Sequence, residues 1–311
     1  MTPELETRLK YCTSLPTIPS VAMKILDLSK DPDLCAEDVS GVVRLDPALS
    51  SKLLRIANSP IYSRISKTEN LQQALTLLGV DASVNLALSF ALVNGLQPTS
   101  SGSTLDYDLV WRRSYISAVS CRLFGETLRL GCLEELFLAG LLQDFGVLAL
   151  DRIMPEQYPA LFNSAEDLST ITTDELKAFG TNHAEVGAWL LADWNLPEKL
   201  VDATRNSHGN EGDGAHDDQR FSDCVLVSGL VADLWLNDHY SDYYQKAAIA
   251  ASQRLGIEAD AFVEYLSRLS ELIPDTAALF ETQLAWPGQS EMILEHAKEV
   301  QLTRELSRAQ N

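Results

Sequence analysis

Apolar residues recur at three- and four-residue spacing along almost the whole chain, and this pattern predicts helix after helix with no convincing strand. Two helices carry clear end signals. Asp46 followed by Pro47 predicts a helix start, because the aspartate accepts hydrogen bonds from unpaired backbone N–H groups and proline loses nothing at the first helical position. Leu71 to Leu78 is followed by Gly79, which is typical of a helix C-terminus. The expected fold class is therefore all-α.

Other helices are predicted from the same spacing and from their flanking residues. Ser20 is expected to cap the helix that follows it. A long helix is expected from about Asp108 to Arg129, closed by Gly131, and a second continuous helix from Leu133 to Arg152. Later helices are expected at 174–180, 183–193, 198–206 and 220–237.

Residues 97–106, QPTSSGSTLD, are the clearest break in composition, since proline, glycine and hydroxyl residues have almost nothing to bury. This linker predicts two packed helical bundles, an N-terminal subdomain of residues 1–96 and a second subdomain of residues 107–240. A glycine-rich, acidic stretch at 209–218 is predicted to be a loop.

Residues 241–311 are predicted to add two or three C-terminal helices, the last running from about Ser290 to Arg308. This last helix would either pack on the domain or connect it to an output domain or a partner helix. Its apolar stripe is imperfect and consists of Met292, Ile293, Ala297, Val300 and Leu302.

Composition narrows the function classes. The chain has 311 residues and is 46% hydrophobic, enough to bury a proper core. Its formal net charge of -20 would repel a phosphate backbone over most of the surface, so nucleic acid is not an expected partner. Neither a membrane-spanning run nor a signal peptide is found, and a cytoplasmic protein without a membrane partner is expected. The five dispersed cysteines are expected to be reduced, buried thiols.

The segment GLLQDFG, residues 140–146, places Gln143 beside Asp144 at the end of an apolar stretch. A histidine followed by an aspartate here would be a pair of metal ligands, whereas an amide is a much weaker ligand than an imidazole. Asp144, His183 and His208 are spaced so that three helices or helix ends could converge on one cation. A two-metal site would need more ligands than these.

Each of these residues also has a structural interpretation. Asp144 could hydrogen-bond a neighbouring helix end, His183 could cap its helix or lie in the core, and His208 borders a polar loop. Phosphate-binding loops, nucleophile elbows and HExxH motifs are absent from the sequence. The remaining histidines are predicted to be surface residues: His216, His239 and His296.

The chain carries five segments typical of one family: LPTIPSVAMKILDLSKDP (15–32), RLDPALSSKLLRIANSPIY (44–62), LQQALTLLG (71–79), ELFLAGLLQDFGVLAL (135–150) and HAEVGAWLLADWNLP (183–197). Together they resemble the HDOD domain, a family related to HD and HD-GYP metal hydrolases that lacks their complete metal-binding set. The resemblance runs from about Leu15 to about residue 240. It implies an all-helical fold in which an N-terminal bundle packs against an HD-like bundle.

The resemblance also implies a vestigial site. In catalytic HD relatives the positions of Gln143 and Asp144 carry the His-Asp pair, and Ser114 occupies the place of an upstream histidine. Asp144, His183 and His208 match retained positions. The resemblance thus implies no bound metal, no cofactor and no catalytic residue.

Members of the family are understood as bacterial signalling and regulatory proteins, often found beside diguanylate-cyclase (GGDEF) or phosphodiesterase (EAL) domains or in histidine-kinase pathways. The resemblance therefore implies a non-enzymatic signal-transduction module that binds a protein partner or a small-molecule ligand. A link to cyclic-di-GMP signalling would run through an adjacent or partner output domain, since the chain has no GGDEF or EAL signature.

Two functional hypotheses follow. In the first, partners bind in a groove between the subdomains that contains Arg55 and Asn58. In the second, the protein is a metal-dependent phosphohydrolase with a reduced, one-metal site at Asp144, His183 and His208.

Overall fold

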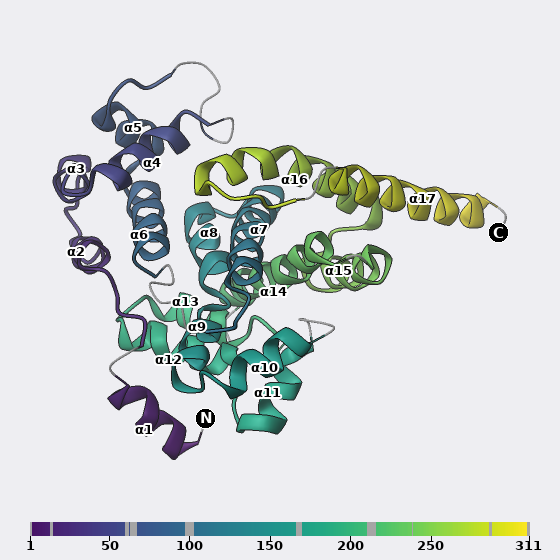
Figure 1. The fold of residues 1–311 in the computed structure, drawn as a ribbon. Helices are drawn as coiled ribbons and strands as arrows, with labels where there is room; N and C mark the ends of the chain where they lie inside the picture. Colours follow the sequence, from purple (N-terminus) through teal and green to yellow (C-terminus); the bar gives the residue numbers. More distant parts are fainter. Residues whose placement is uncertain are drawn as a thin grey trace.

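Figure 1 shows the computed structural model of the chain, which is built of α-helices. No strand occurs in the residues that the structure describes, so the predicted all-α fold class is confirmed. The structure describes residues 2–12, 15–59, 62, 67–96, 103–165, 170–209, 216–237, 239–285 and 288–309.

The N-terminal layer packs short helices around one long apolar helix, which is buried along most of its length because it carries almost no charge. The Asp46 carboxylate accepts hydrogen bonds from the N–H groups of Ala48 (2.9 Å) and Leu49 (3.1 Å), as the helix start predicted from the sequence requires. The layer consists of α2 (Ser20–Leu28), α3 (Ala36–Val43), α4 (Pro47–Ala57), α5 (Leu71–Leu78) and the central α6 (Val80–Leu96).

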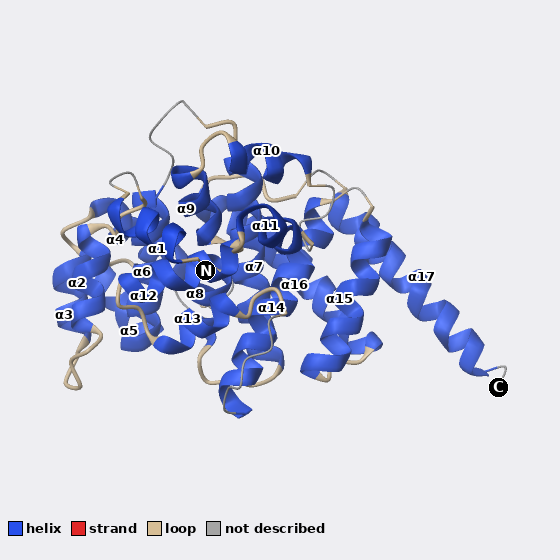
Figure 2. Cartoon of the chain, turned by 90° about the horizontal axis from the view of Figure 1, so that it is seen from below, coloured by secondary structure: helices blue, strands red, loops and turns tan. Residues whose placement is uncertain are grey.

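The second bundle surrounds α7 (Tyr107–Thr127), which is buried from Val110 to Gly125 and packs most closely against α8 and α14. Figure 2 views this bundle from below. The other helices of the bundle are α8 (Leu133–Leu142), α9 (Phe145–Ile153), α10 (Gln157–Ser164), α11 (Ile171–Phe179), α12 (His183–Asp193), α13 (Glu198–Arg205) and α14 (His216–Leu236).

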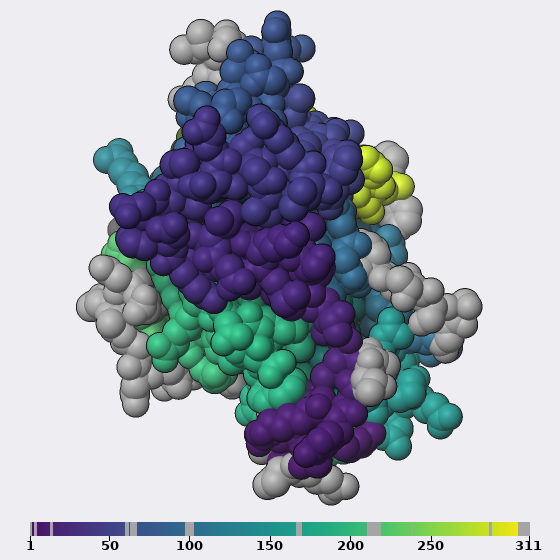
Figure 3. Space-filling view, turned by 90° about the vertical axis from the view of Figure 1, so that its left-hand side faces the viewer, coloured from purple at the N-terminus to yellow at the C-terminus, as the bar shows by residue number. Residues whose placement is uncertain are grey.

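Helix α1 (Pro3–Tyr11) packs against α9 of the second bundle, although the sequence assigns residues 1–96 to the N-terminal subdomain. Leu5 and Leu9 are buried, and the Arg8 guanidinium donates to the carbonyl oxygen of Ile153. Figure 3 shows α1 at the bottom, set apart from the other purple and blue N-terminal helices.

Three helices follow the second bundle: α15 (Tyr240–Leu255), α16 (Ala259–Phe280) and α17 (Gln289–Ala309). Helix α17 projects from the body in Figures 1 and 2. Of its predicted apolar stripe, Ile293 and Ala297 are buried, whereas Met292 and Leu302 are 48% and 57% exposed. The stripe therefore packs on the body only along its first turns.

The ring of Phe280, at the end of α16, joins the N-terminal layer to the second bundle. Its centroid lies 4.1 Å from that of Tyr115 in a stacked arrangement, 5.6 Å from that of Phe90 in α6 and 6.4 Å from that of Phe137 in α8. One side chain from the C-terminal helices thus contacts helices of both preceding layers.

Two predicted helix boundaries are wrong. The continuous helix expected from Leu133 to Arg152 is broken into α8 and α9 at Gln143 and Asp144. Helix α7 ends before Gly131, because Arg129 takes the left-handed conformation (φ 57°) and the Leu130 N–H returns to the carbonyl oxygen of Gly125 at 2.8 Å.

Other local predictions also need correction. Ser20 is not the N-cap of α2 but its first residue; the N-cap position is taken by Pro19, which makes no side-chain capping bond. His296 is partly buried and packs edge-on against Tyr240 and Tyr244, so it is not a simple surface residue. Cys121 and Cys224 are buried as expected, but Cys35 is exposed and Cys12 and Cys132 are half-buried.

Both predicted loops lie partly outside the described residues. Of the linker, residues 97–102 are not described, and Leu105 is buried while the Ser103 hydroxyl donates to Asp151 at 2.5 Å. Of the stretch 209–218, residues 210–215 are not described and His216 already begins α14.

No single helix among the described residues is long and apolar enough to cross a bilayer. Helices α5 and α6 reach that length only as a pair bent by 115°.

Candidate functional site

Two glycines allow the segment around the Asp144 turn to pack closely against α7 and α12. A Cβ on Gly140 would lie 2.7 Å from the backbone oxygen of Ser117, so α8 approaches the backbone of α7 closely. A Cβ on Gly146 would lie 1.8 Å from the backbone oxygen of His183, so α9 touches the start of α12. Both glycines of the GLLQDFG segment are therefore required by close packing around the site.

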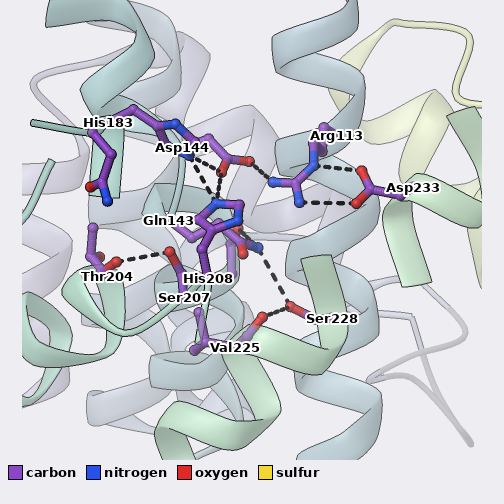
Figure 4. Close-up of polar contacts among 12 residues, drawn as sticks. Arg113, Gln143, Asp144, His183, Thr204, Ser207, His208, Val225, Ser228 and Asp233 are labelled. Atoms are coloured by element: carbon purple, nitrogen blue, oxygen red, sulfur yellow. Dashed lines mark hydrogen bonds and ion pairs between the residues drawn. The ribbon is translucent and has the colours of Figure 1, made fainter. Parts of the chain in front are cut away.

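The structure brings Asp144, His183 and His208 together, as Figure 4 shows. The Nε2 atoms of His183 and His208 are 2.8 Å apart, and each lies 3.5 Å from Asp144 Oδ1. Asp144 and His183 are almost completely buried, and Asp144 Oδ1 has no hydrogen-bond partner among the described residues. Three ligand atoms therefore face one small volume; these three residues are called the triad below.

Glu175 orients the His183 ring by contacting Nδ1, the ring nitrogen that does not face the triad. Its carboxylate lies 2.9 Å from His183 Nδ1 and accepts a further hydrogen bond from the His183 backbone N–H at 2.8 Å. The Tyr158 hydroxyl donates to the same carboxylate at 2.7 Å. A carboxylate on the outer nitrogen fixes the ring and directs Nε2 inward, as in many metal-binding histidines.

These contacts set the protonation of the two imidazoles. Although burial opposes a charged ring, Glu175 and Asp144 raise the pKa of His183 to about 9. Burial and the positive charges of His183 and Arg113 lower the pKa of His208, despite its contact with Asp144. At neutral pH, His183 is therefore the donor to His208 Nε2, and the neutral His208 carries its proton on Nδ1.

Arg113, on α7, places a guanidinium beside the triad. Its Nη1 donates to Asp144 Oδ2, and its Nε donates to Asp233 Oδ1 at 2.8 Å, with Nη2 3.4 Å from Asp233 Oδ2. All three side chains are at most 7% exposed. Burial would raise the pKa of Asp144, but Arg113, together with both histidines, holds it well below its usual range. One fixed cation thus bridges two buried carboxylates.

The hydrogen bonds of the other residues identified from the sequence do not reach the triad. The Gln143 amide donates to the carbonyl oxygen of Gly140 at 3.1 Å and lies 3.5 Å from the Ser228 hydroxyl. The Ser114 hydroxyl is buried without a hydrogen-bond partner among the described residues, and the neighbouring Arg113 reaches the site instead. The Ser207 hydroxyl donates to the carbonyl oxygen of Thr204 at 2.8 Å.

The geometry of the triad fits one small cation. Metal–ligand bonds of about 2.0–2.2 Å put tetrahedral ligand atoms about 3.3–3.6 Å apart, close to two of the three separations at the triad. The same residues do not fit a two-metal centre, because Arg113 already occupies one oxygen of Asp144. The Gln143 amide oxygen has no hydrogen-bond partner among the described residues, but an amide is a much weaker ligand than an imidazole. The cavity at the triad measures about 10 Å³, which is room for about one water molecule and no phosphoryl substrate.

Arg55 and Asn58 line a cleft of about 530 Å³, and its walls are α4 and α16 with side chains of α7 and α8. The cleft therefore lies between the N-terminal layer and the C-terminal helices as well as the second bundle. Arg55 is half-exposed and donates to the carbonyl oxygen of Ala278 at 3.1 Å. The Asn58 amide instead fixes the backbone of Thr68, accepting at 2.7 Å and donating at 2.9 Å.

A family model for the HDOD domain matches residues 15–210. The chain belongs to the HDOD domain family. A structure of an HDOD domain protein of unknown function from Geobacter sulfurreducens is similar over 89% of this chain and 98% of its own, with 21% identity and a TM-score of 0.66. A candidate metal-dependent phosphohydrolase from Shewanella amazonensis SB2B is similar over 89% of this chain and 96% of its own, with 20% identity and a TM-score of 0.64. At these identities both structures show the fold alone.

One curated relative is an uncharacterized protein of Treponema pallidum (strain Nichols), which is 24% identical over 201 residues and 62% of this chain. The chain covers 37% of that relative's own length.

Sequence reasoning missed the carboxylate and guanidinium partners of the site. Glu175 lies eight residues before His183, one helix earlier, and nothing in its surroundings marks it. Asp233 carries one signal that could have found it, because it is a charged residue within an otherwise apolar helix segment, whereas Arg113 stands beside a second arginine, Arg112.

Proposed function

We propose that this HDOD protein is a non-enzymatic bacterial signal-transduction module that acts by binding a protein partner or a small ligand. The observation that carries the proposal is the position of Arg113. Its guanidinium lies between Asp144 and Asp233. A side chain therefore neutralises two carboxylates that would otherwise be available to a metal ion.

Hydrolysis of a phosphoester by a metal centre needs a cation with open coordination positions and space for the substrate beside it. The triad offers three ligand atoms, and the space directly at these atoms measures only about 10 Å³. A substrate could approach them only from the neighbouring space at Arg113 and His208. If the triad holds a cation, His183, His208 and Asp144 would bind it, and it would supply charge to fix the three side chains.

The cleft at Arg55 supports the second part of the proposal, a partner surface. It is about 530 Å³ in volume and borders α16, whose last residue Phe280 contacts both preceding layers. A partner bound there would act on the C-terminal helices directly. We include in the proposal an output through a GGDEF, EAL or histidine-kinase pathway and a link to cyclic-di-GMP signalling.

The experiment measures turnover and metal content together. Protein purified without chelators or a histidine tag is assayed with bis(p-nitrophenyl) phosphate and cyclic di-GMP in the presence of manganese, iron or zinc, and its metal is measured by elemental mass spectrometry. We expect no turnover above that of Asp144→Ala. Metal without turnover would still fit a non-enzymatic module.

A second candidate is a phosphohydrolase with one metal ion, which is favoured by the orientation of His183 by Glu175 and by the position of Asp144 Oδ1, 3.5 Å from both imidazoles. It requires near-stoichiometric metal and turnover that both disappear in Asp144→Ala. That combined result would replace the first proposal.

A further inference from the structure

A second cavity, of about 250 Å³, adjoins the triad at Arg113 and His208. Its outer walls come from α14 and α15, where Leu226, Leu230 and Ala250 are only half-buried. Arg254, on α15, is exposed at its rim, so the cavity communicates with solvent. Unlike the space at the triad, this cavity has room for a ligand.

Two guanidinium groups line this one cavity in a chain whose formal net charge is -20. The Arg254 side chain is 36% exposed and its Nη1 donates to Asp223 Oδ1 at 3.1 Å. A guanidinium has five N–H donors, so this bond leaves most of the donors of Arg254 available at the rim. Arg113 directs three nitrogens to Asp144 and Asp233, and each of its Nη atoms carries a second N–H.

The charges that face these arginines limit what could bind. Asp144 and Asp233 are buried on the inner side of Arg113, and Asp223 pairs with Arg254. Each carboxylate is already bonded to a guanidinium, so donors rather than acceptors are in excess around the cavity. Planar guanidinium forks match the oxygens of a phosphate group, and apolar side chains opposite them would contact the organic part of an ester.

We propose that this cavity binds a small phosphate-bearing anion, inorganic phosphate or a small phosphomonoester, with Arg254 as the contact at the rim and Arg113 as the contact at the floor. The inference rests on the proposed function and deepens it by naming a ligand class. A volume of about 250 Å³ lies just below the range of ~300–1,000 Å³ typical of pockets for drug-sized ligands. The cavity is therefore too small for a cyclic dinucleotide.

Binding here would act on the buried site through Arg113. An anion at the floor of the cavity competes with Asp144 for the same guanidinium, and His208 lines both spaces. The ligand thus has a direct physical route to the contacts that join α7, α12 and the turn before α9.

The test is a calorimetric titration of the full chain with inorganic phosphate and with glycerol 3-phosphate at low ionic strength, and with sodium perchlorate at matched ionic strength. Arg254→Gln removes the rim contact. Arg268→Gln is the matched control, since Arg268 is a surface arginine of similar exposure (45%) that pairs with Glu126 at 3.0 Å and does not line the cavity. A charge-assisted contact predicts that affinity falls about tenfold or more in Arg254→Gln and is unchanged in Arg268→Gln.

Saturable phosphate binding by the wild type, weakened in Arg254→Gln and retained in Arg268→Gln, supports the inference. No saturable binding by the wild type, or equal binding by Arg254→Gln, overturns it. If Arg254→Gln does not fold, Arg254→Lys decides in its place, because it keeps the charge and loses the planar fork, and undiminished affinity would count against the site. Absence of phosphate binding would overturn this inference without changing the expected result of the turnover assay. Conversely, turnover that depends on Asp144 would contradict the proposed non-enzymatic function whether or not phosphate binds.

Discussion

The replacement of Arg113 by methionine tests whether a fixed guanidinium holds the buried site together. Methionine keeps the length and much of the volume of the side chain but removes every donor. Asp144 would lose its bond from Nη1, and Asp233 would lose both of its bonds. Two carboxylates that are 4% and 0% exposed would then lose the guanidinium that they share, and of the two only Asp144 would keep a cation, His183, beside it.

The expected loss is large because the remaining charges cannot reach water. Removing one partner of a buried ion pair destabilises proteins by about 3–5 kcal/mol. With a urea m-value of about 3 kcal/mol per M, the unfolding midpoint would fall by about 1–2 M. Divalent cations should restore part of this stability, since a cation that binds the variant at 100 times its dissociation constant adds about 2.7 kcal/mol.

The assay is urea unfolding followed by far-UV circular dichroism, with and without manganese, on the wild type, Arg113→Met and Arg268→Met. Arg268 pairs with Glu126 at the surface, so its replacement should cost about 1 kcal/mol or less. A midpoint for Arg113→Met within the error of the Arg268→Met value would refute the claim that Arg113 supplies the structural cation. Manganese that stabilised the wild type as much as Arg113→Met would refute the competition between the guanidinium and a metal ion.

Three further predictions test the packing of the core and the state of the thiols. Gly146→Ala should be destabilised severely in thermal melts, because its Cβ would lie 1.8 Å from a backbone oxygen, whereas Gly41→Ala, with no atom within 4 Å, should gain about 0.5–1 kcal/mol; equal melting temperatures would contradict this. Phe280→Ala should lose about 3–5 kcal/mol in urea unfolding, and a loss below 1 kcal/mol would show that its ring stacking is dispensable. Burial raises the pKa of Cys224 to about 12, so iodoacetamide at pH 8 should label the exposed Cys35 first and Cys224 only on unfolding, as mass spectrometry of timed samples would show.

The helix boundaries were predictable where residues next to the boundary determine it. Asp46-Pro47 starts α4 through side-chain acceptance by the aspartate, and residues 183–193 form α12 with the predicted bounds. The break between α8 and α9 was not predictable from periodicity, because apolar residues continue across it. The break follows from tertiary packing, because the backbone at Ser117 lies close to Gly140 and the backbone at His183 lies close to Gly146.

The residues of the site likewise fall into those that the sequence identified and those that it did not. The sequence marks Asp144 and His183 as polar residues beside apolar segments and His208 as a histidine at the border of a polar loop, and the fold brings the three together. The charged partners could not be assigned from one sequence, because Arg113 and Asp233 are 120 residues apart and meet only when α7 packs on α14. The sequence pointed to Ser114 for an upstream ligand, and the adjacent residue fills the space instead.

The position of Phe280 has a consequence for synthesis of the chain on the ribosome. The rings that it contacts, Phe90, Tyr115 and Phe137, are made long before it. At about 5–20 residues per second, the delay between Phe90 and Phe280 is roughly 10–40 s. Throughout that interval an aromatic surface within the family-matched residues 15–210 has no cover, and it is the part of the nascent protein that a chaperone would need to shield.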